Sequence, residues 1–164
     1  MNVFRVSSTA PIIIFYGQGK STLRTALMEY VKNVDITLIC FSIDTYMWQW
    51  LESHSTKTVA SLVVQPGSDF RNIIDCSHKY NNVYSVLVRC TQDQILTLQR
   101  FVRSYARVDG IFDSDQRLLV KLFIDLTLIS EELGDEQRED AKNEFAAQKH
   151  YDRALKFCAL VKKM

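Results

Sequence analysis

Short apolar runs alternate along most of the chain with segments in which apolar residues recur at helical spacing. Most of these runs are continuous and rich in β-branched residues, which is typical of strands buried on both faces of a parallel sheet. The pattern therefore predicts five strands, at residues 12–15, 36–41, 59–64, 83–88 and 108–112.

Helical spacing fills the intervals between the runs. From Leu23 onward, apolar residues fall at i, i+3, i+4, i+7 and i+8, which is one apolar stripe of an amphipathic helix. Comparable stripes follow the later runs. The expected helix starts are Ser21 or Thr22, Asp44, Ser68 or Asp69 after a turn at Pro66–Gly67, and a capping box at Thr91–Gln94.

Strands that alternate with helices predict an α/β fold. We expect a three-layer sandwich around a five-stranded parallel sheet, of the flavodoxin or receiver type. We assign this α/β domain to residues 1–113 and a C-terminal helical extension to residues 114–164, which can pack as part of the same domain.

The C-terminal extension has helical spacing only and predicts a helical hairpin. A first long helix is expected to begin at Ser114 or Asp115 and to end in a left-handed cap at Gly134. A second is expected to run from about Asp140 to Lys163. Its inward stripe would hold Phe145, Tyr151, Ala154, Leu155, Cys158 and Val161.

Composition limits the partners that this fold could have. The chain has 164 residues, 47% of them hydrophobic, and a net charge of +1, which suits one domain of ordinary size. Basic residues do not cluster, so neither nucleic acid nor an anionic membrane surface is an expected partner. No apolar run approaches the roughly 20 residues that span a bilayer.

Cysteine and histidine usage predicts neither a metal site nor a cofactor. The four cysteines form no CxxC motif, and we expect them to be reduced thiols of a cytoplasmic protein. Cys76 and His78 form the only close Cys/His pair, which is too few ligands for zinc. The three histidines, His54, His78 and His150, are expected at the surface near helix ends.

The segment GQGKST, after the first predicted strand, is the candidate binding loop. Gly19-Lys20-Ser21 matches the second half of a P-loop, but Ile14 stands where its first glycine belongs, and about five residues cannot wrap a diphosphate. The same residues would also make a capped corner, with a solvated lysine and a helix N-terminus that attracts anions weakly. The candidate ligand-binding residues are Gly17, Gln18, Gly19, Lys20, Ser21 and Thr22.

Three enzyme or cofactor classes resemble parts of this pattern. The start of the chain is similar to the flavodoxin strand and phosphate loop, although it lacks the glycine between the hydroxyl residues. Receiver domains resemble the strand order, but their acidic and lysine positions hold Tyr16–Gly17, Gln65–Pro66 and Asp113–Ser114. Ser42, Trp48 and Glu52 resemble the helix of TIR-type NAD hydrolases, which implies a catalytic role for Glu52.

The second half of the chain resembles an uncharacterised invertebrate family. The similar segments are VYSVLVRC at 83–90, YARVDGIFDSDQRLLVKLFIDLTL at 105–128, and the final helix, which is similar to the second helix of a tetratricopeptide unit. Multidomain members carry a degenerate receiver-like α/β domain before ADP-ribosyltransferase domains or tetratricopeptide repeats. The resemblance implies a scaffold or interaction role and assigns no catalytic residue.

These observations favour a non-catalytic, cytoplasmic regulatory or protein-interaction module within a larger protein. Its interaction surface would lie on the last helix and would bind a protein partner or a second copy of the chain. The alternatives are a nucleotide- or phosphate-binding protein that uses the loop at 17–22, and a TIR-like NAD hydrolase. The expected interaction residues are Phe145, Tyr151, Leu155 and Cys158.

Overall fold

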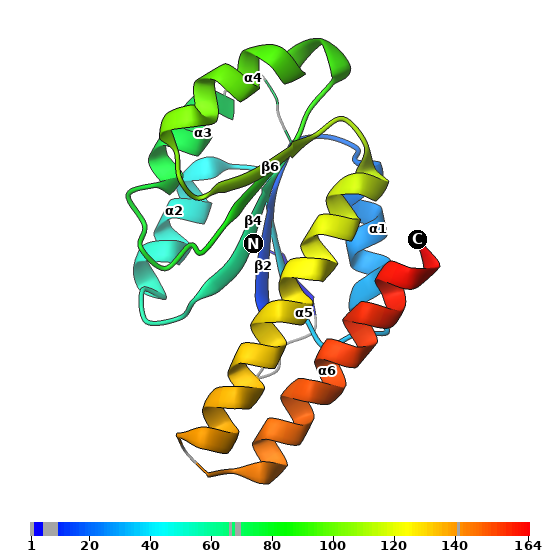
Figure 1. The fold of residues 1–164 in the computed structure, drawn as a ribbon. Helices are drawn as coiled ribbons and strands as arrows, with labels where there is room; N and C mark the ends of the chain where they lie inside the picture. The colour runs from blue at the N-terminus through cyan, green and yellow to red at the C-terminus, as the bar shows by residue number, and fades with distance from the viewer. Residues whose placement is uncertain (1, 5–9, 66, 68–69, 141) are drawn as a thin grey trace. The chain divides into compact units, whose positions relative to one another are not determined.

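The computed structural model describes residues 2–4, 10–65, 67, 70–140 and 142–164, and its ribbon is shown in Figure 1. The strands are β1 (Asn2–Phe4), β2 (Ile12–Tyr16), β3 (Thr37–Phe41), β4 (Val59–Val64), β5 (Val86–Arg89) and β6 (Val108–Phe112). The α-helices are α1 (Thr22–Val31), α2 (Asp44–Ser53), α3 (Phe70–Ser77), α4 (Ile95–Phe101), α5 (Asp115–Glu139) and α6 (Glu144–Lys163).

The strands form one mostly parallel sheet in the order β1-β3-β2-β4-β5-β6, which confirms the α/β class. The sheet has six strands and not the five expected, because β1 joins its edge antiparallel to β3. A three-residue strand, Asn2–Phe4, is too short to produce a periodic signal in the sequence.

Both faces of the parallel strands β2, β3, β4 and β5 are largely buried, which explains their continuous apolar sequences, whereas the edge strand β6 is only half-buried. One face packs against the apolar side chains of α2, α3 and α4. Helix α1 lies on the opposite face (Figure 1), where its stripe of Leu23, Leu27 and Val31 is buried. Successive side chains of a strand point to opposite faces, so Ile13 and Ile14 are both fully buried in different layers.

The predicted helix starts can be compared with the observed ones where the structure describes them. Ile43 and not Asp44 precedes α2, and Asp44 lies in its first turn. Gln94 accepts a hydrogen bond from the Thr91 backbone N–H at 3.1 Å, as a capping box requires. The predicted turn at Pro66 and the predicted cap at Ser68 or Asp69 fall outside the described residues.

The chain divides into two compact units, residues 1–118 and 119–164, and α5 begins in the first and continues through the second. Within the second unit α5 and α6 pack on each other. Phe123 stacks on Phe157 with ring centroids 5.8 Å apart, and Arg138 pairs with Glu144 near the connection.

Gly134 does not end the first long helix, contrary to the prediction. Helix α5 continues through it to Glu139, and its φ is not positive. A Cβ at Gly134 would lie 2.6 Å from the Tyr151 ring, so the glycine is needed for close packing and not for a left-handed cap. Tyr151 is fixed there by donating a hydrogen bond to Asp135 at 2.5 Å.

Helix α6 buries a different stripe from the one expected. It begins at Glu144 and not at Asp140, with Asn143 as its cap. Phe145 and Leu155, expected inward, are 74% and 68% exposed, whereas Tyr151 and Cys158 are half-buried. The buried residues are Ala147, His150, Arg153, Ala154 and Phe157.

His150 is therefore a buried residue, and its prediction as a surface histidine was wrong. It lies 2.8 Å from the guanidinium of Arg153, measured from its Nδ1 atom. Two polar residues inside the stripe shifted its apparent phase, because sequence periodicity counts only apolar residues as buried.

We predict that Gly134→Ala destabilises the protein by about 1–3 kcal/mol, because the new methyl group overlaps the Tyr151 ring. Alanine would otherwise favour the helix. Urea unfolding measures the change, and Glu136→Ala on the exposed side of α5 is the control, expected to be near neutral. A stabilised Gly134→Ala variant would contradict this packing role.

Candidate functional site

The carboxyl ends of the parallel strands are where open α/β sheets bind ligands, at the point where the strand order reverses. Here β2 lies between β3 and β4, so that point is beside the end of β2. The predicted loop follows directly: residues 17–21 connect Tyr16, the last residue of β2, to Thr22, the first of α1.

The two glycines of the loop are each required for a different structural reason. Gly17 is buried, and a Cβ there would lie 2.9 Å from the Phe15 ring and 3.3 Å from the Cβ of Gln65. Gly19 has a φ of 71°, a left-handed conformation that favours glycine. Gly17 thus permits close approach of β2 and β4, and Gly19 permits the turn into α1.

Ser21 makes the polar contacts that begin α1. Its Oγ accepts a hydrogen bond from the Arg24 backbone N–H at 3.0 Å, which confirms it as the helix cap. The same hydroxyl donates to Oε1 of Gln65, the residue after β4. The hydroxyl thus acts both as a donor and as an acceptor within the protein, and Ser21 is only 7% exposed.

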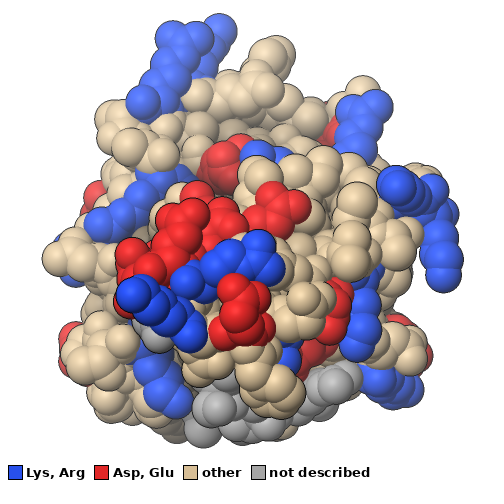
Figure 2. Space-filling view, turned by 60° about the horizontal axis from the view of Figure 1, so that its bottom comes forward, with Lys and Arg blue, Asp and Glu red and all other residues tan. Residues whose placement is uncertain are grey.

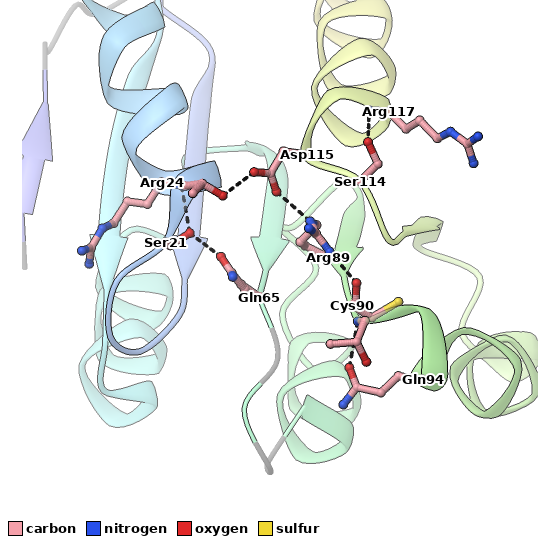
Figure 3. A network of polar contacts seen from close by, with 11 residues as sticks. Ser21, Arg24, Gln65, Arg89, Cys90, Gln94, Ser114, Asp115 and Arg117 are labelled. Atoms are coloured by element: carbon pink, nitrogen blue, oxygen red, sulfur yellow. Dashed lines mark hydrogen bonds and ion pairs between the residues drawn. The ribbon is translucent and has the colours of Figure 1, made fainter.

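Thr22 belongs to a second set of contacts, part of which is drawn in Figure 3. Its hydroxyl donates to Oδ2 of Asp115 at 2.5 Å, and the Arg89 Nε donates to Oδ1 of the same carboxylate at 2.6 Å. Arg89 also donates from Nη1 to the Cys90 carbonyl at 2.5 Å. Asp115 thereby connects the start of α1, the end of β5 and the start of α5.

Asp115 is held in its ionised form by these neighbours. Partial burial of the carboxyl group raises its pKa, but the hydrogen bonds from Thr22 and Arg89 and the charge of Arg89 outweigh that effect. The pKa of Asp115 therefore lies below its usual value of 3.8. Its position in the first turn of α5 also places it at the positive end of that helix.

An open depression of about 410 Å³ lies beside the start of α1. It is lined by Lys20, Ser21, Thr22, Arg24 and Thr25. Lys20, Gln18 and Gly19 are exposed, and Gln18 donates a long hydrogen bond of 3.5 Å to the Ser42 carbonyl. Two cationic side chains near a helix N-terminus give this depression the chemistry of a weak anion site.

Gln65, Arg89 and Asp115 are the residues of this region that the sequence analysis did not identify as partners of the loop. From the sequence, Gln65 is notable only because it stands where receiver domains carry an acid, and Asp115 only because it can cap a helix. Each follows, or ends, a predicted strand, and parallel strands bring their carboxyl ends to one edge. That rule could have placed them near the loop, but not their individual hydrogen bonds.

The residues that resemble a TIR-type site are spread along α2. Ser42 precedes the helix, whereas Glu52 lies in its last turn. Glu52 accepts a hydrogen bond from the Tyr80 hydroxyl at 3.1 Å, and the Tyr80 ring stacks on Trp48 with centroids 5.3 Å apart. Glu52 and Tyr80 also line an open pocket of about 590 Å³, away from the loop at 17–21.

The described residues contain no group of three or more His, Cys, Asp or Glu side chains that could hold a metal ion. The four cysteines are free thiols, and burial raises the pKa of Cys40 to about 11. In the part of the chain that the structure describes, no helix has the length and apolar character needed to cross a membrane.

We predict that Asp115→Asn lowers the free energy of unfolding by about 1 kcal/mol near neutral pH, because Arg89 loses its charged partner. The folded pKa of Asp115 is depressed, so this contribution is present above pH 3.8 and is lost as pH falls through the folded pKa. Urea unfolding at several pH values should show the two proteins converging in acid. Asp113→Asn, in the connection just before α5, is the control, and a gap that persists in acid would contradict the assignment.

Searches against protein-family models, curated proteins and solved structures find no match for this chain. The resemblance of its second half to an invertebrate family therefore stays a prediction.

Proposed function

We propose that this chain is a non-catalytic regulatory or protein-interaction module. The observation that carries the proposal is the contact of Thr22 and Arg89 with the Asp115 carboxylate at the strand ends. In a P-loop the residue at the position of Ser21 would hold a magnesium ion. Here the hydroxyls of Ser21 and Thr22 both stabilise the junction between secondary-structure elements.

The strand order is consistent with a degenerate receiver. Without the edge strand β1, the parallel strands follow the order found in flavodoxin-like folds. The positions that carry acids in a receiver are occupied by Gly17 and Gln65, neither of which can accept a phosphoryl group or help to coordinate a metal through a carboxylate. Such a domain would act through its surfaces and not through phosphoryl transfer.

Four free cysteines favour a reducing compartment, and we propose a cytoplasmic location on that basis. Cys40 and Cys90 are buried, and burial raises the pKa of both thiols. Thiols of this kind are unreactive packing residues.

A second candidate function is phosphate or nucleotide binding at the loop Gly17–Thr22. The depression lined by Lys20 and Arg24 favours it, because both side chains are cationic and lie at the start of α1. On the first proposal Lys20 is a solvated surface residue. On the second it makes the principal contact with the anion.

A thermal-shift screen with ATP, GTP, NAD, FMN and inorganic phosphate distinguishes the two candidates. A ligand at 100 times its dissociation constant stabilises a protein by about 2.7 kcal/mol. That increment moves the unfolding midpoint of a domain of this size by roughly 5–11 °C. We expect no shift with any of these ligands.

Lys20→Ala and Lys57→Ala are the matched variants for this screen. Lys57 is also exposed, but it precedes β4 and so lies at the opposite edge of the sheet. A ligand shift that Lys20→Ala abolishes and Lys57→Ala retains would overturn the first proposal in favour of the second. Turnover of ATP or NAD by the unmodified protein would overturn the non-catalytic proposal, and turnover of NAD would make Glu52 the next residue to replace.

A further inference from the structure

One exposed face of α5 carries an ordered series of charged and apolar residues. The series has spacings that alternate between four and three residues, which keeps its members on one side of a helix. At its centre are Ile124 and Leu128, which are 41% and 55% exposed. From N- to C-terminus the series is Arg117, Lys121, Ile124, Leu128, Glu131 and Asp135.

The charges of this face are unfavourable for an isolated helix. Its cations lie toward the N-terminus of α5 and its acids toward the C-terminus, the reverse of the order that the helix dipole favours. Arg117 and Lys121, and likewise Glu131 and Asp135, are also like-charged neighbours four residues apart, which destabilises a helix. Lys121 is partly compensated by an ion pair with Asp125 at 3.0 Å.

Acidic side chains are especially dense around the end of α5 and the start of α6. Figure 2 shows them gathered there, with Lys and Arg side chains among them. Glu132, Glu136 and Glu139 add further acids to this end of α5, Asp140 follows directly after the helix, and all four are exposed. Acidic side chains therefore predominate on the C-terminal side of the apolar pair, and the cations of the face lie on its N-terminal side.

We propose that this face binds the same face of a second copy of the chain, with the two α5 helices antiparallel. A two-fold axis would pass midway between Ile124 and Leu128. It would place Ile124 of each copy against Leu128 of the other copy. The same axis places Lys121 opposite Glu131, since each lies three residues outside the apolar pair. It also places Arg117 opposite Asp135, so the face is complementary to itself.

This inference rests on the proposed function, because it names the partner of the interaction module. It moves the interface from the predicted α6 residues to α5. On α6, the exposed ring of Phe145 lies under the Lys149 ammonium at 4.8 Å, and its neighbours at Gln148 and Asp152 are polar. On α5 the charges themselves specify the partner and the orientation.

Sedimentation equilibrium of the full chain over a wide concentration range tests the pairing. We expect a reversible dimer at low ionic strength that weakens as salt is added, because the outer contacts are exposed charge pairs. Lys121→Glu and Glu131→Lys each place like charges opposite one another twice per dimer. Each single variant should weaken the dimer by about tenfold or more.

The double variant Lys121→Glu/Glu131→Lys restores opposite charges and should recover most of the dimer. Lys162→Glu, a charge reversal at an exposed position of α6, is the control and should leave the dimer unchanged. Circular dichroism verifies that each variant is folded, and the salt dependence of the unmodified protein tests the pairing without any substitution.

A monomer at every concentration would overturn the pairing of two copies, and so would a double variant no stronger than either single one. Neither result would touch the proposed function itself, because the ligand screen decides that separately. A dimer that is insensitive to salt and to both single variants would place the interface on another surface and would also overturn the inference.

Discussion

The burial of both faces of a parallel sheet constrains the rest of the first unit. Apolar side chains must fill both layers, as Ile13 and Ile14 do, so polar chemistry is confined to the strand ends. At the carboxyl edge, the polar groups of three connections meet around the Asp115 carboxylate. Thr22 donates to one oxygen of this carboxylate and Arg89 to the other, so the junction connects α1 with the first turn of α5. The polar residues of this edge are therefore engaged in contacts between secondary-structure elements.

Much of this fold can be predicted from the sequence because its signals are local. Continuous β-branched runs identify the parallel strands, and Ser21 is recognisable as a cap from its position before an apolar stripe. The edge strand β1 was missed because three residues carry no periodicity. The junction at Asp115 was missed for a different reason: its partners, Thr22 and Arg89, are 93 and 26 residues away along the chain. Strand order brings them together, and sequence spacing does not record strand order.

The second unit illustrates two ways in which local rules give wrong answers. Gly134 was predicted to end a helix. It lies inside α5 instead, where the absence of a side chain allows the Tyr151 ring to pack closely against it. His150 and Arg153 are buried polar residues, so a stripe defined by apolar residues alone was displaced around α6: Ala154 is buried as expected, but Phe145 and Leu155 are exposed. The exposed face of α5 differs from these two cases, because its signal is present in the sequence but cannot be interpreted without the structure. Its charge order is visible in the sequence, but it becomes informative only once the helix is known to continue past Gly134 to the acids beyond it.

The most direct test of the junction is a double-mutant cycle on Thr22 and Asp115, measured by urea unfolding near neutral pH. Thr22→Val removes the hydroxyl with little change in shape, and Asp115→Asn removes the charge that accepts its hydrogen bond. If the contact stabilises the fold, the two substitutions together should cost less than the sum of the single ones, by about 1 kcal/mol. Strictly additive effects would contradict the account, because they would show that the hydroxyl and the carboxylate contribute nothing to each other. The loop would then be better explained as a binding site whose polar groups await a ligand.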